Sequence, residues 1–265
     1  MKIAISGKGG VGKTLVAGAL ACFFADHDMK TLAIDADPSP NLALTLGISP
    51  EEARKIVPVL ENEKLLQEKT DTGVPGVFRL SFTVDDVVRD FSIKTPCNVN
   101  LIVMGTVRVM GAGCTCPANA MIRSLLRHVV VERDEVVLLD MEAGVEHIGR
   151  GTAKQVEAML IVTDSSIKSL EIARHIHDLA QKAGIRQLFI VGNKIANERQ
   201  KEAVERYAKI HSLILLDEVP HDEEVVEAEM KGETPLKRKE SVAIKSIERI
   251  GTKLLNTLQT GSTSA

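Results

Sequence analysis

A glycine-rich segment near the start of the chain has the residue types and spacing of a phosphate-binding loop. Residues 7–14 read Gly-Lys-Gly-Gly-Val-Gly-Lys-Thr, which satisfies the pattern of a glycine, four residues and Gly-Lys-Thr. The glycines let backbone N–H groups surround a phosphate at a helix N-terminus, the second lysine reaches the β- and γ-phosphate oxygens, and the hydroxyl binds Mg²⁺. The sequence therefore predicts a nucleotide site made of Gly9, Gly10, Val11, Gly12, Lys13 and Thr14.

Two aspartates follow apolar, strand-like runs, and parallel strands would bring them to one edge of a sheet. Asp140 suits a carboxylate that holds Mg²⁺ through water opposite Thr14. Asp37 lies where ligands of doubly wound folds gather, so we expect it to orient the attacking water of a hydrolysis. The alternative is that Asp37 or Asp35 only caps a turn before Pro38, because Asp-Pro commonly opens turns.

A pair of cysteines suggests a second chemistry. Cys114 and Cys116 alternate in the glycine-flanked loop 111–117, just before a helical pattern at 118–130, and residues i and i+2 of an extended segment project the same way. Two thiolates are half of a four-coordinate site, which a twofold dimer axis would complete for Zn²⁺ or Ni²⁺. A redox-active pair and an incidental packing pair are the alternatives. We expect Cys22 and Cys97 to be ordinary buried thiols, and we assign no histidine as a ligand.

Composition limits the classes of protein that these sites can belong to. The chain has 265 residues, with 33 basic and 36 acidic residues and a net charge of −3. It therefore has no broad positive electrostatic field that would favour nonspecific binding to nucleic acid. Aromatic residues make up only 3%, which argues against base-stacking platforms. No apolar stretch reaches the roughly 18 to 20 residues that cross a bilayer, and no leader pattern is seen. We expect a cytoplasmic protein with reduced thiols.

The elements that must position these residues follow an alternating order. Continuous apolar runs of strand length alternate with helical patterns at 15–25, 167–183 and 198–210, which is typical of a doubly wound α/β fold with a mainly parallel sheet covered on both faces. The strand-like runs are residues 2–6, 31–34, 101–104, 136–139, 159–162, 188–191 and 214–216.

Two stretches depart from this alternation. Residues 49–98 resemble a short helix and an excursion more than a sheet strand, so we treat the chain as one domain, 1–265, with an insertion there. Near the end, Ile244, Ile247, Ile250, Leu254 and Leu258 share one helical face before a polar tail at about 260–265. We expect this helix to pack on the sheet; the alternative is that it lies on a membrane.

A second lysine, Lys8, at the start of the loop resembles the deviant phosphate loop of the Min and Par partition ATPases and the nitrogenase iron protein. The resemblance implies that Lys8 crosses a face-to-face dimer to the partner's nucleotide and joins Lys13 and Asp37 in catalysis; the alternative is a solvated loop lysine. It also places Asp37 and Asp140 in two switches. It further assigns a γ-phosphate-sensing glycine at Gly144 and an adenine pocket at Asn193, Lys194, Pro220 and Asp222.

Three segments make the resemblance more specific. Residues 113–117, 140–152 and 76–80 look like the nickel-insertion accessory ATPases of carbon monoxide dehydrogenase, of CooC type. This implies an ATP-hydrolysing homodimer that carries nickel on the paired cysteines of both subunits to the apo-dehydrogenase. The accessory ATPase of acetyl-CoA synthase is an alternative. Glu142, Glu146 and His147 follow the switch and are not assigned as ligands.

Two further alternatives come from other classes of protein. The first is an electron carrier like the nitrogenase iron protein, although that family's second cysteine lies after the switch, where this chain has Val145-Glu146-His147. The second is a partitioning or membrane-positioning ATPase, for which the cysteine pair would have no purpose.

Overall fold

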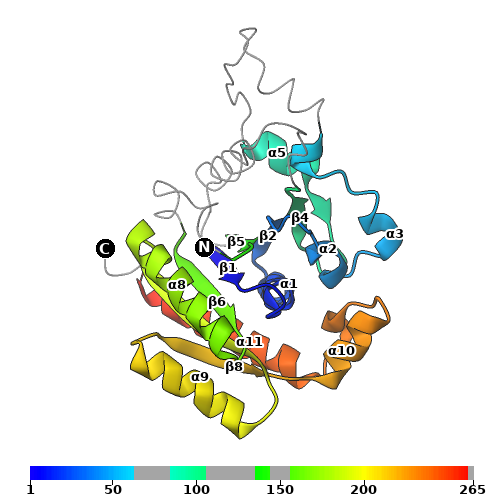
Figure 1. Cartoon of the computed structure of the whole chain (residues 1–265). Helices are drawn as coiled ribbons and strands as arrows, with labels where there is room; N and C mark the ends of the chain where they lie inside the picture. The colour runs from blue at the N-terminus through cyan, green and yellow to red at the C-terminus, as the bar shows by residue number, and fades with distance from the viewer. Residues whose placement is uncertain (63–83, 106–134, 144–155, 262–265) are drawn as a thin grey trace, which may run out of the picture.

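An eight-stranded sheet forms the centre of the molecule (Figure 1). The computed structural model describes residues 1–62, 84–105, 135–143 and 156–261. The strand order is β3-β4-β2-β5-β1-β6-β7-β8, and every pair is parallel except β3 with β4. The strands are β1 (Lys2–Gly7), β2 (Lys30–Asp35), β3 (Ile93–Lys94), β4 (Asn100–Val103), β5 (Glu135–Asp140), β6 (Ala158–Thr163), β7 (Gln187–Ile195) and β8 (Leu215–Pro220).

Helices cover both faces of this sheet. Helices α1 and α11 pack on one face, and α8 and α9 pack on the other (Figure 1). The predicted doubly wound α/β class is therefore confirmed. The helices are α1 (Lys13–Asp26), α2 (Leu42–Thr45), α3 (Pro50–Ala53), η1 (Val59–Glu61), α5 (Val84–Phe91), α8 (Ile167–Ala183), α9 (Glu198–Ile210), α10 (Glu223–Met230), η2 (Pro235–Lys237) and α11 (Val242–Gly261).

The central strands are almost wholly apolar because they contribute to two cores. In β1, Ala4 packs into the core under α8 and α9, while Ile3 and Ile5 pack into the core under α1 and α11. Successive side chains of a strand point to opposite faces, so burial on both faces removes any alternation with polar residues. All six residues of β6 are buried for the same reason.

The last helix packs within the fold. The apolar face of α11 is buried against α1, and Gly251 allows a close approach to the ring of Phe23. Helix α11 also packs on strand β8, which confirms the expected packing on the sheet. No helix in the described part of the chain is both long and apolar enough to cross a membrane. The helix continues to Gly261, so it includes the first two residues of the expected polar tail.

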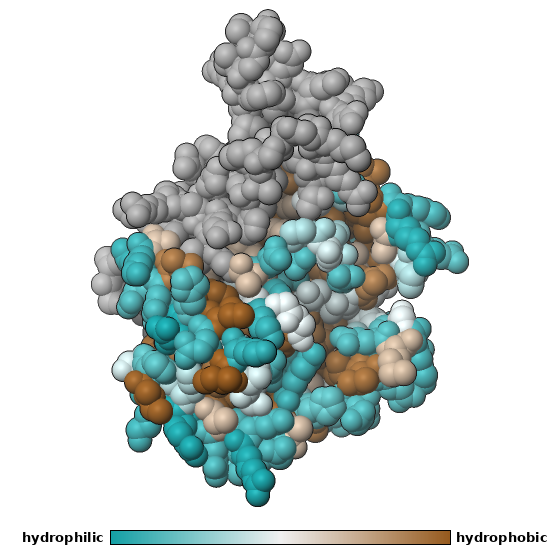
Figure 2. Space-filling model, viewed as in Figure 1, coloured by the Kyte–Doolittle hydropathy of each residue, from teal (hydrophilic) through white to brown (hydrophobic). Residues whose placement is uncertain are grey.

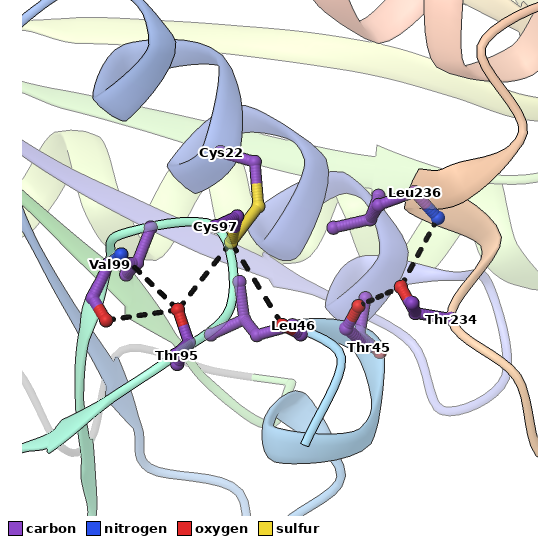
Figure 3. The surroundings of a disulfide bond; sticks show 8 residues. All are labelled: Cys22, Thr45, Leu46, Thr95, Cys97, Val99, Thr234 and Leu236. Atoms are coloured by element: carbon purple, nitrogen blue, oxygen red, sulfur yellow. Dashed lines mark hydrogen bonds between the residues drawn. A yellow bond between two sulfur atoms is a disulfide. The ribbon is translucent and has the colours of Figure 1, made fainter. Parts of the chain in front are cut away.

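The prediction for two of the cysteines is wrong. Cys22 of α1 and Cys97 of the β3–β4 turn form a disulfide, with their Cα atoms 5.5 Å apart (Figure 3). That separation is ordinary for a disulfide. The two residues are 75 positions apart in sequence, and only the tertiary fold brings the turn onto α1.

The segment 49–98 also differs from expectation. It contains the edge strand β3, which pairs antiparallel with β4 through Ile93 opposite Leu101, where the sequence pattern favoured no sheet strand. Two residues are too few to show a period, so the pairing partner decides the conformation. The expected helix is present as α5. Residues 76–80 and the expected helix at 118–130 lie outside the described residues, and the division into one domain with an insertion stays a prediction.

Candidate phosphate and metal site

The phosphate loop joins β1 to α1 as the sequence predicts. Gly10 and Gly12 have φ angles of 81° and 91°, in the left-handed region that glycine adopts without strain. Gly12 is also the N-cap of α1, and no side chain caps the helix there. The N-cap residue therefore offers no side-chain acceptor to the first N–H groups of α1, which suit an anion at the positive end of the helix.

Two lysines flank this loop. Lys13 is buried, and its Nζ donates a hydrogen bond to the Lys8 carbonyl at 3.4 Å. Lys8 is half-buried and lies near Asp164, which follows β6. Burial raises the pKa of Asp164, but hydrogen bonds from Ser166 and the positive charge of Lys8 hold that pKa below its ordinary value. The charge of Lys8 therefore acts on a carboxylate that follows β6.

Asp140 and Asp35 are neighbours at the carboxyl ends of β5 and β2. They are register partners in the sheet, and both are fully buried. Burial and the nearby charge of Asp35 raise the pKa of Asp140 to about 7, although the Thr14 hydroxyl and Lys13 act to lower it. Neither carboxylate oxygen of Asp140 has a hydrogen bond of ordinary geometry in the described structure. A buried, unpartnered carboxylate near a threonine hydroxyl is a donor set that fits Mg²⁺.

Asp35 shapes the loop that follows β2. Its Oδ1 accepts a hydrogen bond from the Asp37 N–H at 3.2 Å, and its Oδ2 accepts one from the Leu42 N–H at 2.9 Å. Burial raises the pKa of Asp35 to about 6, while these N–H groups act to lower it. Asp35 therefore takes the turn-capping role. Asp37 accepts from the Ser39 N–H at 2.9 Å but also lines the cavity described below, so its expected role in orienting water stays a prediction.

A cavity of about 610 Å³ extends from the phosphate loop to a mouth between α2 and α10 (Figure 2). This volume is within the range of small-molecule sites. The cavity brings together residues that the sequence analysis took from four distant segments. Those lining it are Gly9, Gly10, Gly12, Lys13, Thr14, Asp37, Asn193, Lys194, Pro220 and Asp222.

The residues expected to hold adenine already have partners within the protein. Asp222 is the N-cap of α10, where it accepts from the Glu224 N–H at 2.9 Å, and it also accepts from the Ser241 hydroxyl at 2.6 Å and the Ala243 N–H at 3.1 Å. It thereby joins the start of α10 to that of α11. Asn193 is almost completely buried against the phosphate loop. Their role in binding adenine stays a prediction.

The expected site residues Gly144, Cys114 and Cys116 lie outside the described part of the chain, as do the unassigned Glu146 and His147. Glu142 is described and exposed, and its carbonyl accepts from the Ser6 hydroxyl at 3.1 Å. Within the described ranges, no group of three or more His, Cys, Asp or Glu side chains could hold a metal ion. The sequence analysis missed Asp164, although it follows an apolar run just as Asp37 and Asp140 do.

Comparison with known sequences gives the family of this site. Residues 2–236 match the family described as the CobQ/CobB/MinD/ParA nucleotide binding domain. An ATP-binding protein of Methanocaldococcus jannaschii is 42% identical over 253 residues, which cover 94% of this chain and 96% of that protein. The carbon monoxide dehydrogenase accessory protein CooC of Rhodospirillum rubrum is 38% identical over 234 residues, 88% of each chain.

Solved structures share the fold over nearly the whole length. The MinD cell division protein of Aquifex aeolicus has a TM-score of 0.70 at 20% identity and covers 96% of this chain and 97% of its own. MinD of Pyrococcus horikoshii, complexed with Mg-ADP, has a TM-score of 0.64 at 22% identity and covers 96% of each chain. With its phosphate loop and these relatives, the chain belongs to the CobQ/CobB/MinD/ParA family of nucleotide-binding proteins and is a homologue of CooC.

Proposed function

We propose that the protein is an ATP-hydrolysing, dimeric metallochaperone that delivers nickel during maturation of carbon monoxide dehydrogenase. The observation that carries the proposal is the 38% identity to CooC over 88% of both chains. A built phosphate loop with adjacent buried carboxylates supports the ATPase part, because it offers N–H groups and a lysine for phosphates beside oxygen ligands for Mg²⁺.

Five residues in and around the phosphate loop have separate parts in this hydrolysis. Lys13 leaves the Lys8 carbonyl to bind the β- and γ-phosphate oxygens, and Thr14 and Asp140 would hold Mg²⁺. The metal neutralises charge on the phosphates when it is bound. Asp37 orients the attacking water. Lys8 reaches the partner subunit's nucleotide, so that turnover depends on dimerisation.

Nickel is the cargo of the proposed dimer. Cys114 and Cys116 of each subunit supply two thiolates, and the four thiolates together bind Ni²⁺ in a square plane or Zn²⁺ in a tetrahedron. ATP-driven dimerisation would then assemble the metal site and the catalytic site in one step. The client is an apoenzyme whose active cluster contains nickel; acetyl-CoA synthase is the alternative client.

Anaerobic metal analysis of size-separated protein, with and without ATP and Ni²⁺, tests this proposal. We expect roughly one nickel per dimer for the wild type, because one four-coordinate site needs both subunits. Cys114→Ser/Cys116→Ser should lose the nickel and keep ATP affinity, while the matched control Cys22→Ser/Cys97→Ser should keep the nickel. Equal nickel content in wild type and the Cys114/Cys116 variant would refute the metal site. A brown protein with charge-transfer absorption would indicate an iron–sulfur electron carrier instead.

The ATPase part is tested by Lys8→Ala. We expect this variant to bind ATP with nearly unchanged affinity and to lose ATP-dependent dimerisation and turnover. Full hydrolysis by Lys8→Ala would refute the proposed role across the dimer.

A further inference from the structure

The end of β7 contacts the phosphate loop directly, although 182 residues separate them in sequence. The Asn193 side-chain amide donates a hydrogen bond to the Val11 carbonyl at 2.7 Å, and Lys194 Nζ donates one to the Gly10 carbonyl at 2.8 Å. Adjacent residues of one strand end therefore hold adjacent carbonyls of the loop. Both donors also line the cavity.

These two contacts satisfy carbonyls that an anion-binding loop leaves outside. When successive N–H groups turn inward around a phosphate, the carbonyls between them face away and need other donors. The Gly12 carbonyl accepts the first helical bond, from the Val16 N–H at 3.2 Å. The carbonyls of Gly10 and Val11 precede the helix and receive their donors from β7 instead.

Backbone strain and close packing both accompany the contact. Lys194 has a φ angle of 59°, which is unfavourable for any residue with a Cβ atom. Asn193 is 2% exposed, and its amide lies so close to Gly12 that a Cβ atom on Gly12 would overlap it. Unfavourable backbone conformations persist where the surrounding contacts require them, and here the conformation of Lys194 accompanies its hydrogen bond to the loop.

We propose that Asn193 and Lys194 are positioning residues that hold the phosphate loop in its anion-binding shape, independently of any contact with the nucleotide base. The inference rests on the proposed binding of ATP at this loop. In this role the end of β7 connects the expected adenine-binding side of the cavity to the phosphate loop. A substitution at Asn193 or Lys194 would then lower the affinity of the protein for the phosphates of the ligand. A residue that only recognised adenine would have no effect on a ligand without a base.

Binding of Mg-ATP and of inorganic tripolyphosphate, measured by calorimetry on the full chain, distinguishes these roles. Asn193→Ala removes one buried hydrogen bond without changing charge, and we expect about tenfold weaker binding of both ligands. Lys194→Ala should weaken both at least as much, because it removes a charged donor. Thermal unfolding of each variant verifies that it is folded.

Asn197→Ala is a matched control from the same region. Asn197 caps α9 by accepting from the Gln200 N–H at 3.1 Å and makes none of the loop contacts described above. Its loss should destabilise the fold to a similar degree yet leave affinity for tripolyphosphate unchanged. If Asn193→Ala and Lys194→Ala bind tripolyphosphate as tightly as the wild type and only ATP binding weakens, the proposed positioning of the phosphate loop is refuted. The proposed phosphate site is not affected by that result. If the wild type binds neither ligand, the nucleotide site itself is refuted.

Discussion

The disulfide between Cys22 and Cys97 closes a loop of 75 residues, so its reduction should lower the free energy of unfolding. A cross-link restricts the unfolded chain, and the chain-entropy relation gives about 4.5 kcal/mol at 25 °C for a loop of this length. Spread over the unfolding entropy of a chain of 265 residues, this corresponds to a fall of about 8 °C in Tm. The comparison changes no residue of the chain, because the same polypeptide is measured oxidised and reduced.

Urea unfolding of the two forms, followed by circular dichroism, measures the difference. Alkylation and peptide mapping of the unreduced protein must first show Cys22 and Cys97 protected, which verifies the starting state. Cys22→Ser/Cys97→Ser should resemble the reduced form and should not respond to reductant. Equal stability of verified oxidised and reduced protein would refute the reasoning, since the loop would then contribute no restriction to the unfolded state. A reducing environment would keep the protein in its less stable form.

Two further predictions concern pH and packing. The pKa of Asp140 is raised from 3.8 to about 7, so its contribution to stability is complete below pH 3.8 and is lost as the pH rises to about 7. Asp140→Asn should therefore flatten the curve of unfolding free energy against pH between these values, measured on ligand-free protein. An unchanged slope would contradict the raised pKa of Asp140. Gly251→Ala should destabilise the protein by about 1–3 kcal/mol in urea unfolding, because the new methyl group overlaps Phe23. The control Thr252→Ala, at an exposed position of the same helix, should have little effect. If Gly251→Ala were more stable than the wild type, α1 and α11 would be able to move apart without a cost in free energy.

Sequence patterns predicted those features that depend on residues close together in the chain. Seven of the eight strands were expected from continuous apolar runs, because a strand buried on both faces must be apolar where it is buried. The phosphate loop was expected because its glycines, lysine and threonine lie within one short segment and each residue type has its own role in binding phosphate or Mg²⁺. The edge strand β3 was missed because its two residues carry no period and only the partner β4 makes them a strand.

Pairings between distant segments could not be predicted. The register of β2 with β5 places Asp35 beside Asp140, and this contact contributes to the raised pKa of Asp140. The same limitation applies to Cys22 and Cys97, which the sequence analysis took for separate thiols. In both cases each residue is ordinary in its own segment, and its chemistry changes only when the fold supplies a neighbour.

By itself, the sequence determined the fold class, the phosphate loop and the acidic residues at strand ends, because each is encoded by residue types within a few positions. The tertiary structure alone decided which of those residues meet: Asp35 with Asp140, Cys22 with Cys97, and the end of β7 with the phosphate loop. The reason is that burial, charge and hydrogen bonding act over a few ångströms, while the partners are separated by 75 to 182 positions of chain.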